Sequence, residues 1–406
     1  MEERALLRHP RCTAALGLLT VVGVAAPVDA RITEITITTT TSPAFAGQSF
    51  GQVGQYEQLD GTAFGEIGPQ DPLNTVIQDI ELASRNSRGM VEYSMDFSIL
   101  KPIDTSRGNR TILFDVVNRG NKSSPSLNIG GGATTAGDGF LESEGYTLVW
   151  SGWEGDITTG IKINLPIATN KDGSEITSPV RAEYIFNNAA ASTVDVTAPP
   201  AYSAVSSSNA GATLTRRVHQ DDAKELIDNS QWAFADCSAT PFPGTPNPTK
   251  VCFNGGFDTN HSYELVYTAK NPTVTGIGFA ATRDFNSFLR GHGQNGGTGA
   301  APANPLGNSI DYAIIYGSSQ SGRWIRTFLE LGFNEGEDRD RVFEGAIPHK
   351  ASNRGAFNIR FAQPTRLSGT QHTEKQFPGQ ESPQTWGNTL DPIAGLCGAA
   401  RSLPQI

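Results

Sequence analysis

A short apolar strand, a tight turn of small residues and an amphipathic helix follow one another between residues 311 and 331. The turn reads Gly-Ser-Ser-Gln-Ser-Gly from Gly317 to Gly322, and Gly332 is positioned to end the helix. A strand that passes into a helix through such a sharp turn is the setting of a nucleophile elbow, which exposes a serine hydroxyl at the edge of an α/β sheet. This order of elements predicts an α/β fold, with the turn as its candidate site.

Ser319 is the better placed of two candidate nucleophiles in the turn. A nucleophile elbow needs small residues two positions before and after the serine, and Ser319 has Gly317 and Ser321 there. The strict G-x-S-x-G pattern is not met, because Ser321 replaces the last glycine. Ser321 itself would be flanked by Ser319 and the bulky Arg323. Two alternatives stay open: a simple connector, or a helix N-terminus that binds an anion.

Backbone N–H groups near Ser319 are expected to stabilise the oxyanion of an acyl-transfer intermediate. A helix start carries unpaired N–H groups and the positive end of the helix dipole, so the N–H of Gln320 can point at such an oxygen. A second donor normally comes from the loop after an earlier strand, where this chain has Asn118, Arg119 and Gly120. The sequence therefore predicts an oxyanion hole formed by Gln320 and this loop.

The partners of the serine are harder to identify. In a hydrolase of this topology the acid and then the histidine follow the nucleophile. His349, after a strand expected over residues 342–347, is the candidate base, although the pattern favours a structural or substrate-contacting histidine. Trp153 follows a strand end and is interpreted as a core residue or as a wall of the substrate pocket. The other residues considered are His372, His219, His261 and His292 for the base, and Glu344 and Asp391 for the acid.

The N-terminal half contains two kinds of strand. Residues 32–41 and 91–100 alternate apolar and polar side chains, which predicts antiparallel strands with one buried face. Residues 111–117 and 146–150 are nearly continuous apolar runs, and a short helix is expected between them at 139–144. Such runs predict parallel strands of a βαβ unit.

The middle of the chain does not continue this α/β pattern. Residues 158–262 are rich in Pro, Ser, Thr, Ala and Asn, which predicts an inserted cap with short strands such as 181–186. The α/β pattern is expected to return with the strand 263–267 and a helix over 276–289. The predicted division is a signal peptide at 1–30, a β-rich N-terminal portion at 31–110, the first part of an α/β core at 111–157, the insertion at 158–262, the second part of the core at 263–366 and an irregular tail at 367–406.

The first thirty residues have the pattern of an export signal. Arg4, Arg8 and Arg11 precede an apolar stretch over residues 12–28, and the segment ends in Val-Asp-Ala30, a cleavage-site pattern. A buried helix or an uncleaved anchor is the alternative. We expect cleavage after Ala30 and a secreted or periplasmic protein.

Cysteine spacing agrees with export. Outside the cytoplasm Cys237 and Cys252 could close a short Pro-rich loop, which would stabilise the fold by about 3 kcal/mol. Cys397 is left over as a candidate free thiol. The chain has neither a CxxC pair nor the Cys/His spacing of a zinc site, so no metal or cofactor is predicted.

Composition limits the partners. The net charge of −10, from 41 acidic and 31 basic residues, argues against a nucleic-acid-binding surface. No segment after the signal is long and apolar enough for a membrane helix. The elbow motif, rather than composition, makes a small-molecule ester the expected partner. The acidic residues 335–340 after the helix are interpreted as a solvated turn.

A family pattern runs through much of the chain, in residues 61–74, 116–122, 145–157, 263–289, 317–351 and 357–366. Together these stretches resemble a family of exported bacterial α/β-hydrolase-domain proteins. The resemblance implies an α/β-hydrolase-type, mostly parallel sheet and, by analogy, serine esterase chemistry. The SQSG turn is also similar to the elbow of cutinases and glucuronoyl esterases, in which the serine equivalent to Ser319 attacks.

The same resemblance raises a second hypothesis. Related proteins continue through further strands that would carry the catalytic histidine, whereas the residues after Arg366 are polar and loop-like. We therefore expect a sheet without its C-terminal strands. The favoured function is an exported serine hydrolase that forms an acyl-enzyme on Ser319. The alternative is a truncated, catalytically incomplete hydrolase-fold protein that acts as a binding module or has no function.

Overall fold

The computed structural model describes most of the chain between residues 31 and 364. The described ranges are 31–186, 191–197, 201–219, 221–292, 302–351 and 357–364, with the strand pair β19 (Thr389–Leu390) and β20 (Cys397–Gly398). The predicted signal peptide, the side chain of Cys397, His372, Asp391 and most of the predicted tail lie outside them. Within the described ranges, no helix has the length and apolar character needed to cross a bilayer.

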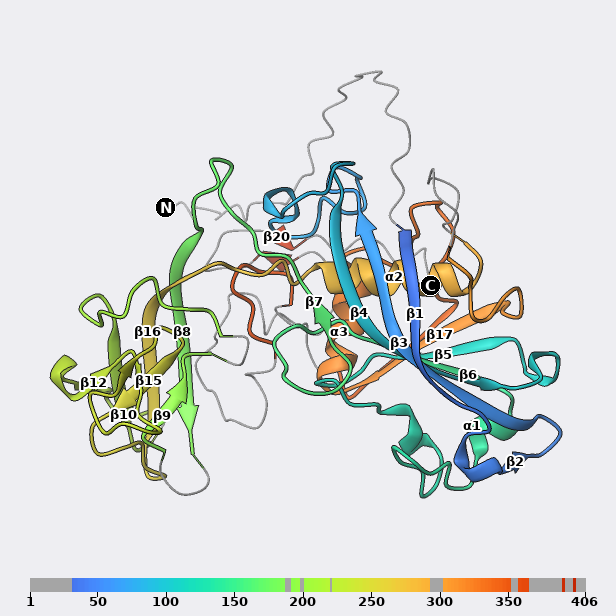
Figure 1. The fold of residues 1–406 in the computed structure, drawn as a ribbon, viewed down its shortest axis with the longest axis horizontal. Coiled ribbons are helices and arrows are strands. Elements are labelled where there is room, and N and C mark those ends of the chain that lie inside the picture. The colour runs from blue at the N-terminus through green and yellow to red at the C-terminus, as the bar shows by residue number, and fades with distance from the viewer. Residues whose placement is uncertain are drawn as a thin grey trace, which may run out of the picture.

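The main sheet contains nine strands within the described residues, and its path runs β1-β3-β4-β6-β5-β17-β18 (Figure 1). Short strands β2 and β7 pair with β3 and β4 at its sides. The strands are β1 (Arg31–Thr41), β2 (Ser49–Phe50), β3 (Gly54–Ile67), β4 (Val91–Pro102), β5 (Thr111–Asp115), β6 (Thr147–Ser151), β7 (Ile163–Asn164), β17 (Tyr312–Ser318) and β18 (Gly345–His349).

The two halves of this sheet differ in strand direction. β1, β3 and β4 pair antiparallel, whereas β5 pairs parallel with β6 and β17, and β17 pairs parallel with β18. The predicted parallel unit of β5, the short helix α1 (Phe140–Ser143) and β6 is confirmed. The antiparallel N-terminal strands form one edge of this sheet, because β1 is the last strand on that side and β4 pairs with β6.

Two helices pack together against this sheet through aromatic side chains. α2 (Ile277–Leu289) and α3 (Gln320–Glu330) meet where Phe279 stacks on Trp324, with ring centroids 4.7 Å apart. Phe285 of α2 lies 5.5 Å from Phe97 of β4. Both helices were predicted, and Gly332, with φ 85°, follows the end of α3 as expected.

The acidic segment after α3 differs from the predicted solvated turn at one residue. The side chain of Glu337 is only 5% exposed and lies against α2. Its Oε1 accepts hydrogen bonds from Asn74 Nδ2 at 2.6 Å and from Arg283 Nη2 at 3.1 Å. The buried guanidinium of Arg283 requires a carboxylate partner, and no local pattern in the segment reports that requirement.

A second, smaller lobe is built from antiparallel strands around its own aromatic core (Figure 1). One sheet has the order β11-β10-β16-β8 and a second the order β12-β15-β9, beside the pair β13-β14. The strands are β8 (Thr177–Ile185), β9 (Thr193–Asp195), β10 (Thr213–Arg217), β11 (Glu225–Ile227), β12 (Trp232–Ala233), β13 (Ala235–Asp236), β14 (Thr245–Pro246), β15 (Lys250–Phe253) and β16 (Ser262–Lys270).

The prediction that residues 263–267 return to the α/β core is wrong. They belong to β16, which pairs antiparallel with β8 and β10 in the small lobe. Burial alternates along β16, with Tyr263, Leu265 and Tyr267 inside and their neighbours partly exposed. Alternation is typical of an antiparallel strand with one covered face, whereas β6 is buried throughout.

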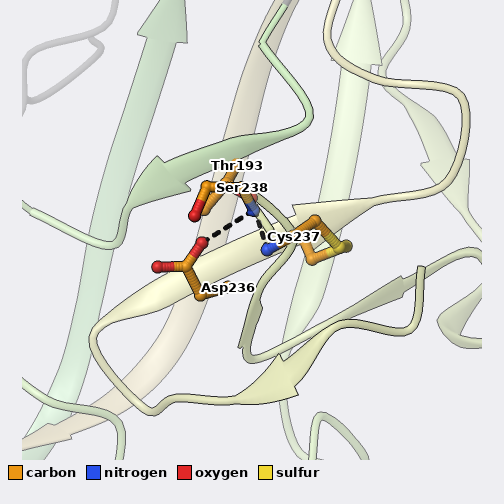
Figure 2. The surroundings of a disulfide bond; sticks show 5 residues. Thr193, Asp236, Cys237 and Ser238 are labelled. Atoms are coloured by element: carbon orange, nitrogen blue, oxygen red, sulfur yellow. Dashed lines mark hydrogen bonds between the residues drawn. A yellow bond between two sulfur atoms is a disulfide. The ribbon is translucent and has the colours of Figure 1, made fainter. Parts of the chain in front are cut away.

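The predicted disulfide between Cys237 and Cys252 is present in the small lobe (Figure 2). The two Cα atoms are 5.5 Å apart, and 15 positions separate the residues in the sequence. The N–H of Cys237 donates to Thr193 Oγ1 at 2.7 Å, which ties the bridge to β9. The disulfide thus fastens the segment after β13 to β15.

Residues 357–364 join the two lobes. Phe357 packs against Trp153 in the main core, with ring centroids 5.4 Å apart. Phe361 packs against Tyr202 of the small lobe at 5.1 Å, and the Tyr202 hydroxyl donates to Ala362 O at 2.8 Å. This segment therefore fixes the small lobe beside the main sheet.

Candidate active site

The carboxyl ends of the parallel strands bring the predicted site residues to one edge of the main sheet. β5, β6, β17 and β18 run in the same direction, so the segments that follow them leave from the same edge. β5 connects forward to β6 on one side, while β17 lies on its other side. Ligands bind in α/β sheets at such a reversal of strand order.

Ser319 lies at this reversal in a strained backbone conformation. Its φ of 61° and ψ of −114° are rare for a residue with a side chain and cost roughly 1 to 3 kcal/mol. Its N–H donates to His349 O at 2.9 Å, and its C=O accepts from Arg323 N at 3.0 Å. The residue is exposed, and its hydroxyl makes no hydrogen bond to any described group. The fold thus presents this hydroxyl to solvent between β17 and α3.

Two glycines allow this turn. A Cβ on Gly317 would lie 2.9 Å from backbone and side-chain atoms of Ser321, and one on Gly322 would lie 2.4 Å from His349 O. The glycine lies at 322 rather than 321 because α3 contacts the end of β18, at His349, through residue 322. This explains how the turn forms although its motif departs from G-x-S-x-G.

Ser321, the other candidate nucleophile, is in a different environment. It is fully buried, and its Oγ donates to Val117 O at 3.0 Å. Its hydroxyl therefore holds α3 against the loop after β5. This placement favours Ser319 as the nucleophile.

The loop after β5 lies beside Ser319, as expected for an oxyanion loop. Asn118 Nδ2 donates to Ser318 O at 2.8 Å, and Asn118 and Asn121 exchange two backbone hydrogen bonds. Arg119 and Gly120 both have positive φ, of 50° and 77°. Within the described part of the chain, the N–H groups of Arg119 and Gly120 have no acceptor. The loop therefore offers free donors next to the elbow, and its role as an oxyanion hole stays a prediction.

Asp115 holds this loop and was missed from the sequence. Its buried Oδ2 accepts hydrogen bonds from Ser123 N at 2.7 Å, Ser124 N at 2.6 Å and Trp150 Nε1 at 2.7 Å. The carboxylate at the end of β5 thus fixes the point where the loop returns. Burial raises the pKa of Asp115 to about 6, against the opposing effect of these hydrogen bonds. An acidic residue inside the apolar run 111–117 was the available signal.

The side chain of Gln320 anchors the first turn of α3. It is fully buried, and its Nε2 donates to Glu154 Oε1 and to Pro364 O, both at 3.0 Å. Pro364 belongs to the segment that joins the lobes, and the neighbouring Gln363 donates to Arg181 O of the small lobe at 3.3 Å. The small lobe therefore adjoins the site, although its action as a cap stays a prediction.

His349 lies next to the elbow but is not bonded to Ser319. Its Nδ1 is 3.1 Å from Ser318 Oγ, and its ring stacks on Tyr316. The strand expected over 342–347 is in fact β18 (Gly345–His349), so His349 is its last residue. A base role for His349 stays a prediction.

Glu344 does not fit the role of catalytic acid. Its Oε2 accepts from Ala313 N at 2.8 Å and its Oε1 from Arg290 Nη2 at 2.9 Å. It precedes β18 and therefore lies at the amino end of the parallel strands, opposite the edge that carries Ser319.

Trp153 is a residue of the main core, and its role as a wall of the substrate pocket stays a prediction. Its side chain is buried, its Nε1 donates to Val117 O at 2.7 Å, and its ring lies 5.5 Å from that of Trp324. The earlier histidines have other partners: His219 pairs with Asp222 and His261 with Asp258 in the small lobe, and His292 pairs with Asp340.

One surface cluster could in principle hold a metal. Within the described residues, ligand atoms of His292, Asp338 and Asp340 lie within 4.8 Å of one another, with His292 Nδ1 2.9 Å from Asp340. Two members are exposed, and the His–Asp contact accounts for the arrangement. We assign no metal to it.

Comparison with known proteins agrees with the fold. Residues 201–389 match the model of a family described as alpha/beta hydrolase domain. The matched stretch, a little under half of the chain, includes α2, β17, the elbow, α3 and β18. The match supports an α/β-hydrolase-domain family and a hydrolase-type fold for this part of the chain. No curated protein and no solved structure shows a significant match to it.

Proposed function

We propose that this protein is a serine hydrolase that cleaves a carboxylic ester through an acyl-enzyme on Ser319. The observation that carries the proposal is the backbone of Ser319, whose φ of 61° and ψ of −114° hold an exposed hydroxyl at the start of α3. Such a strained position persists only where the surrounding structure maintains it, and strain of this kind is concentrated at functional sites. The match of residues 201–389 to an alpha/beta hydrolase domain supports the same proposal.

The reaction would proceed in two steps. Ser319 Oγ attacks the acyl carbon and gives its proton to a base, and the alcohol then leaves with that proton. Water next attacks the acyl-enzyme and releases the acid. The N–H of Gln320 and those of the Arg119–Gly120 loop are the candidate donors to the oxyanion. If His349 is the base, its ring has to leave Ser318 and turn toward Ser319.

The second candidate is a hydrolase-fold protein that binds ligands without catalysis. The observation that favours it is the Ser319 hydroxyl, which has no histidine partner among the described residues. A serine without a base keeps a high pKa and is a poor nucleophile.

Labelling with a fluorophosphonate probe separates the two candidates. We expect the wild type and Ser321→Ala to be labelled and Ser319→Ala to remain unlabelled, with all three folded by circular dichroism. Ser321→Ala is the matched control, because it removes the neighbouring buried hydroxyl. His349→Gln should slow labelling if His349 is the base. A folded wild type that neither reacts with the probe nor hydrolyses simple phenyl esters would support the binding module.

We further propose that the protein is exported and that its signal is removed after Ala30. The pattern of the first thirty residues supports this, as does the Cys237–Cys252 disulfide, because disulfides persist mainly in oxidising compartments. Mass spectrometry of the secreted or periplasmic protein should find a chain that begins at Arg31. Recovery of the intact chain from the cytosol alone would contradict export.

A further inference from the structure

Two arginines lie on the two segments that meet at Ser319. Arg119 belongs to the loop after β5, and the amide of its neighbour Asn118 donates to Ser318 O at 2.8 Å. Arg323 lies one helical turn after Ser319, and its N–H donates to Ser319 O at 3.0 Å. Residues four apart share a face of a helix, and their side chains tilt toward its N-terminus, so the side chain of Arg323 is directed toward the turn that carries Ser319.

Neither arginine is paired with a carboxylate in the described part of the chain. The side chain of Arg119 has one hydrogen bond, from Nη1 to the neutral Oδ1 of Asn118 at 2.9 Å, and its buried Nε has no acceptor. The guanidinium of Arg323, which is half-buried, has no acceptor among the described residues. By contrast, the buried Arg283 of α2 contacts the carboxylates of Asp284 and Glu337. The two arginines at the elbow therefore differ from Arg283, which is neutralised by carboxylates on its own helix and on the segment after α3.

The charges of these arginines act on each other. Burial lowers the pKa of Arg323, and the nearby charge of Arg119 lowers it further. Burial also lowers the pKa of Arg119, which the carboxylates of Glu154 and Asp156 partly offset. Both guanidinium groups stay protonated at neutral pH, because the pKa of arginine lies far above neutrality even when burial lowers it. Two partly buried cations held together are unfavourable until an anion neutralises them.

We propose that Arg119 and Arg323 bind a free carboxylate of the substrate, so that the preferred substrates are esters with a second, anionic carboxyl group near the scissile bond. Guanidinium groups present planar sets of N–H donors that match the two oxygens of a carboxylate. The N-terminus of α3, where unpaired N–H groups and the positive end of the helix dipole lie, adds to the attraction. This inference rests on the proposed esterase function of Ser319.

A matched pair of esters tests the inference. Monophenyl glutarate carries the free carboxylate, and phenyl methyl glutarate has the same skeleton with that group masked; phenol release reports both. The wild type should prefer the anionic ester by roughly tenfold or more in kcat/KM, since hydrogen bonds to charged groups contribute about 1.5 to 3 kcal/mol. Arg119→Gln and Arg323→Gln should bring that ratio close to one. Arg339→Gln, which removes an exposed arginine paired with Glu335, is the control and should leave the ratio unchanged.

A binding measurement keeps the inference separate from the proposed function. Glutarate should bind to Ser319→Ala, as measured by calorimetry, and adding Arg119→Gln or Arg323→Gln should abolish that binding. If glutarate binds to Ser319→Ala but the wild type hydrolyses neither ester, the esterase proposal is overturned and the anion site is supported. Equal rates for both esters in the wild type, or glutarate binding that survives both arginine substitutions, would overturn the anion site.

Discussion

The small lobe and the carboxyl edge of the main sheet differ in whether their charged side chains have partners of opposite charge. In the small lobe, charged side chains pair with one another, and a disulfide fastens the strands. Arg216 pairs with Glu225 at 2.8 Å and Lys250 with Asp195 at 3.0 Å near the surface, and the buried Arg217 lies 4.0 Å from Glu183. At the carboxyl edge, Ser319 is strained, two arginines lack carboxylate partners within the described residues, and Asp115 is buried. The comparison teaches that the small lobe is stabilised by its polar groups, whereas the edge holds polar groups in positions that cost stability. Such positions are typical of sites that bind or react.

The largest effect is expected from a methyl group at the elbow. In Gly322→Ala the new Cβ would lie 2.4 Å from His349 O and 3.0 Å from Gly317 O, both backbone atoms that cannot move freely. We expect a loss of roughly 3 kcal/mol in the free energy of unfolding and a loss of Ser319 labelling of about a hundredfold or more. Urea unfolding and the rate of probe labelling measure the two effects.

Gly211→Ala is the matched control for this change. Gly211 lies in the small lobe, and a Cβ there would meet nothing within 4 Å. It should leave both the unfolding free energy and labelling nearly unchanged. Equal behaviour of the two variants would remove the proposed difference between the regions.

The disulfide provides the converse test. Replacing both Cys237 and Cys252 by alanine should destabilise the small lobe by about 3 kcal/mol, because the unfolded loop regains its freedom. Labelling of Ser319 should persist, because the bridge lies within the small lobe (Figure 2). Hydrogen exchange resolved by peptide measures the local loss, and reduced wild type should behave like the variant. If the variant without the disulfide also lost Ser319 labelling, the two regions would not be independent.

The smallest effect is a pH dependence that originates at Asp115. Since burial raises the pKa of Asp115 to about 6 from an ordinary 3.8, the folded state holds its proton over a range where the unfolded chain has lost it. The resulting stability is present below about pH 4 and is lost as the pH rises through about 6, by roughly 2 to 3 kcal/mol. In Asp115→Asn this loss should disappear from urea unfolding curves.

Asp172→Asn is the control of opposite sign. The side-chain hydrogen bond from Ser174 lowers the pKa of Asp172, so its small contribution is present above its usual pKa and is lost as the pH falls. If Asp115→Asn and the wild type had the same pH dependence of stability, burial of Asp115 would not cost stability. The difference between the carboxyl edge and the small lobe would then be weaker.

Strand type was predictable where burial leaves a clear pattern. The continuous apolar runs at 111–117 and 146–150 correspond to β5 and β6, and the alternating runs to β1 and β4. β16 was misassigned because an apolar face of aromatic residues looks like a core strand, while its partners β8 and β10 are identified only by tertiary pairing. Trp153 followed a strand end, and nothing local indicated that its ring would pack against Trp324.

The sequence by itself determined the strand, the small-residue turn and the helix around Ser319, because glycine spacing and hydrophobic periodicity act over a few neighbouring residues. It also determined the Cys237–Cys252 bridge, whose partners lie only 15 positions apart. The tertiary structure alone decided what surrounds Ser319. Asn118 meets Ser318 across 200 positions, and Glu154 meets Gln320 across 166. Such contacts depend on which strands become neighbours in the sheet, a choice made by the packing of the whole core and not by the residues on either side.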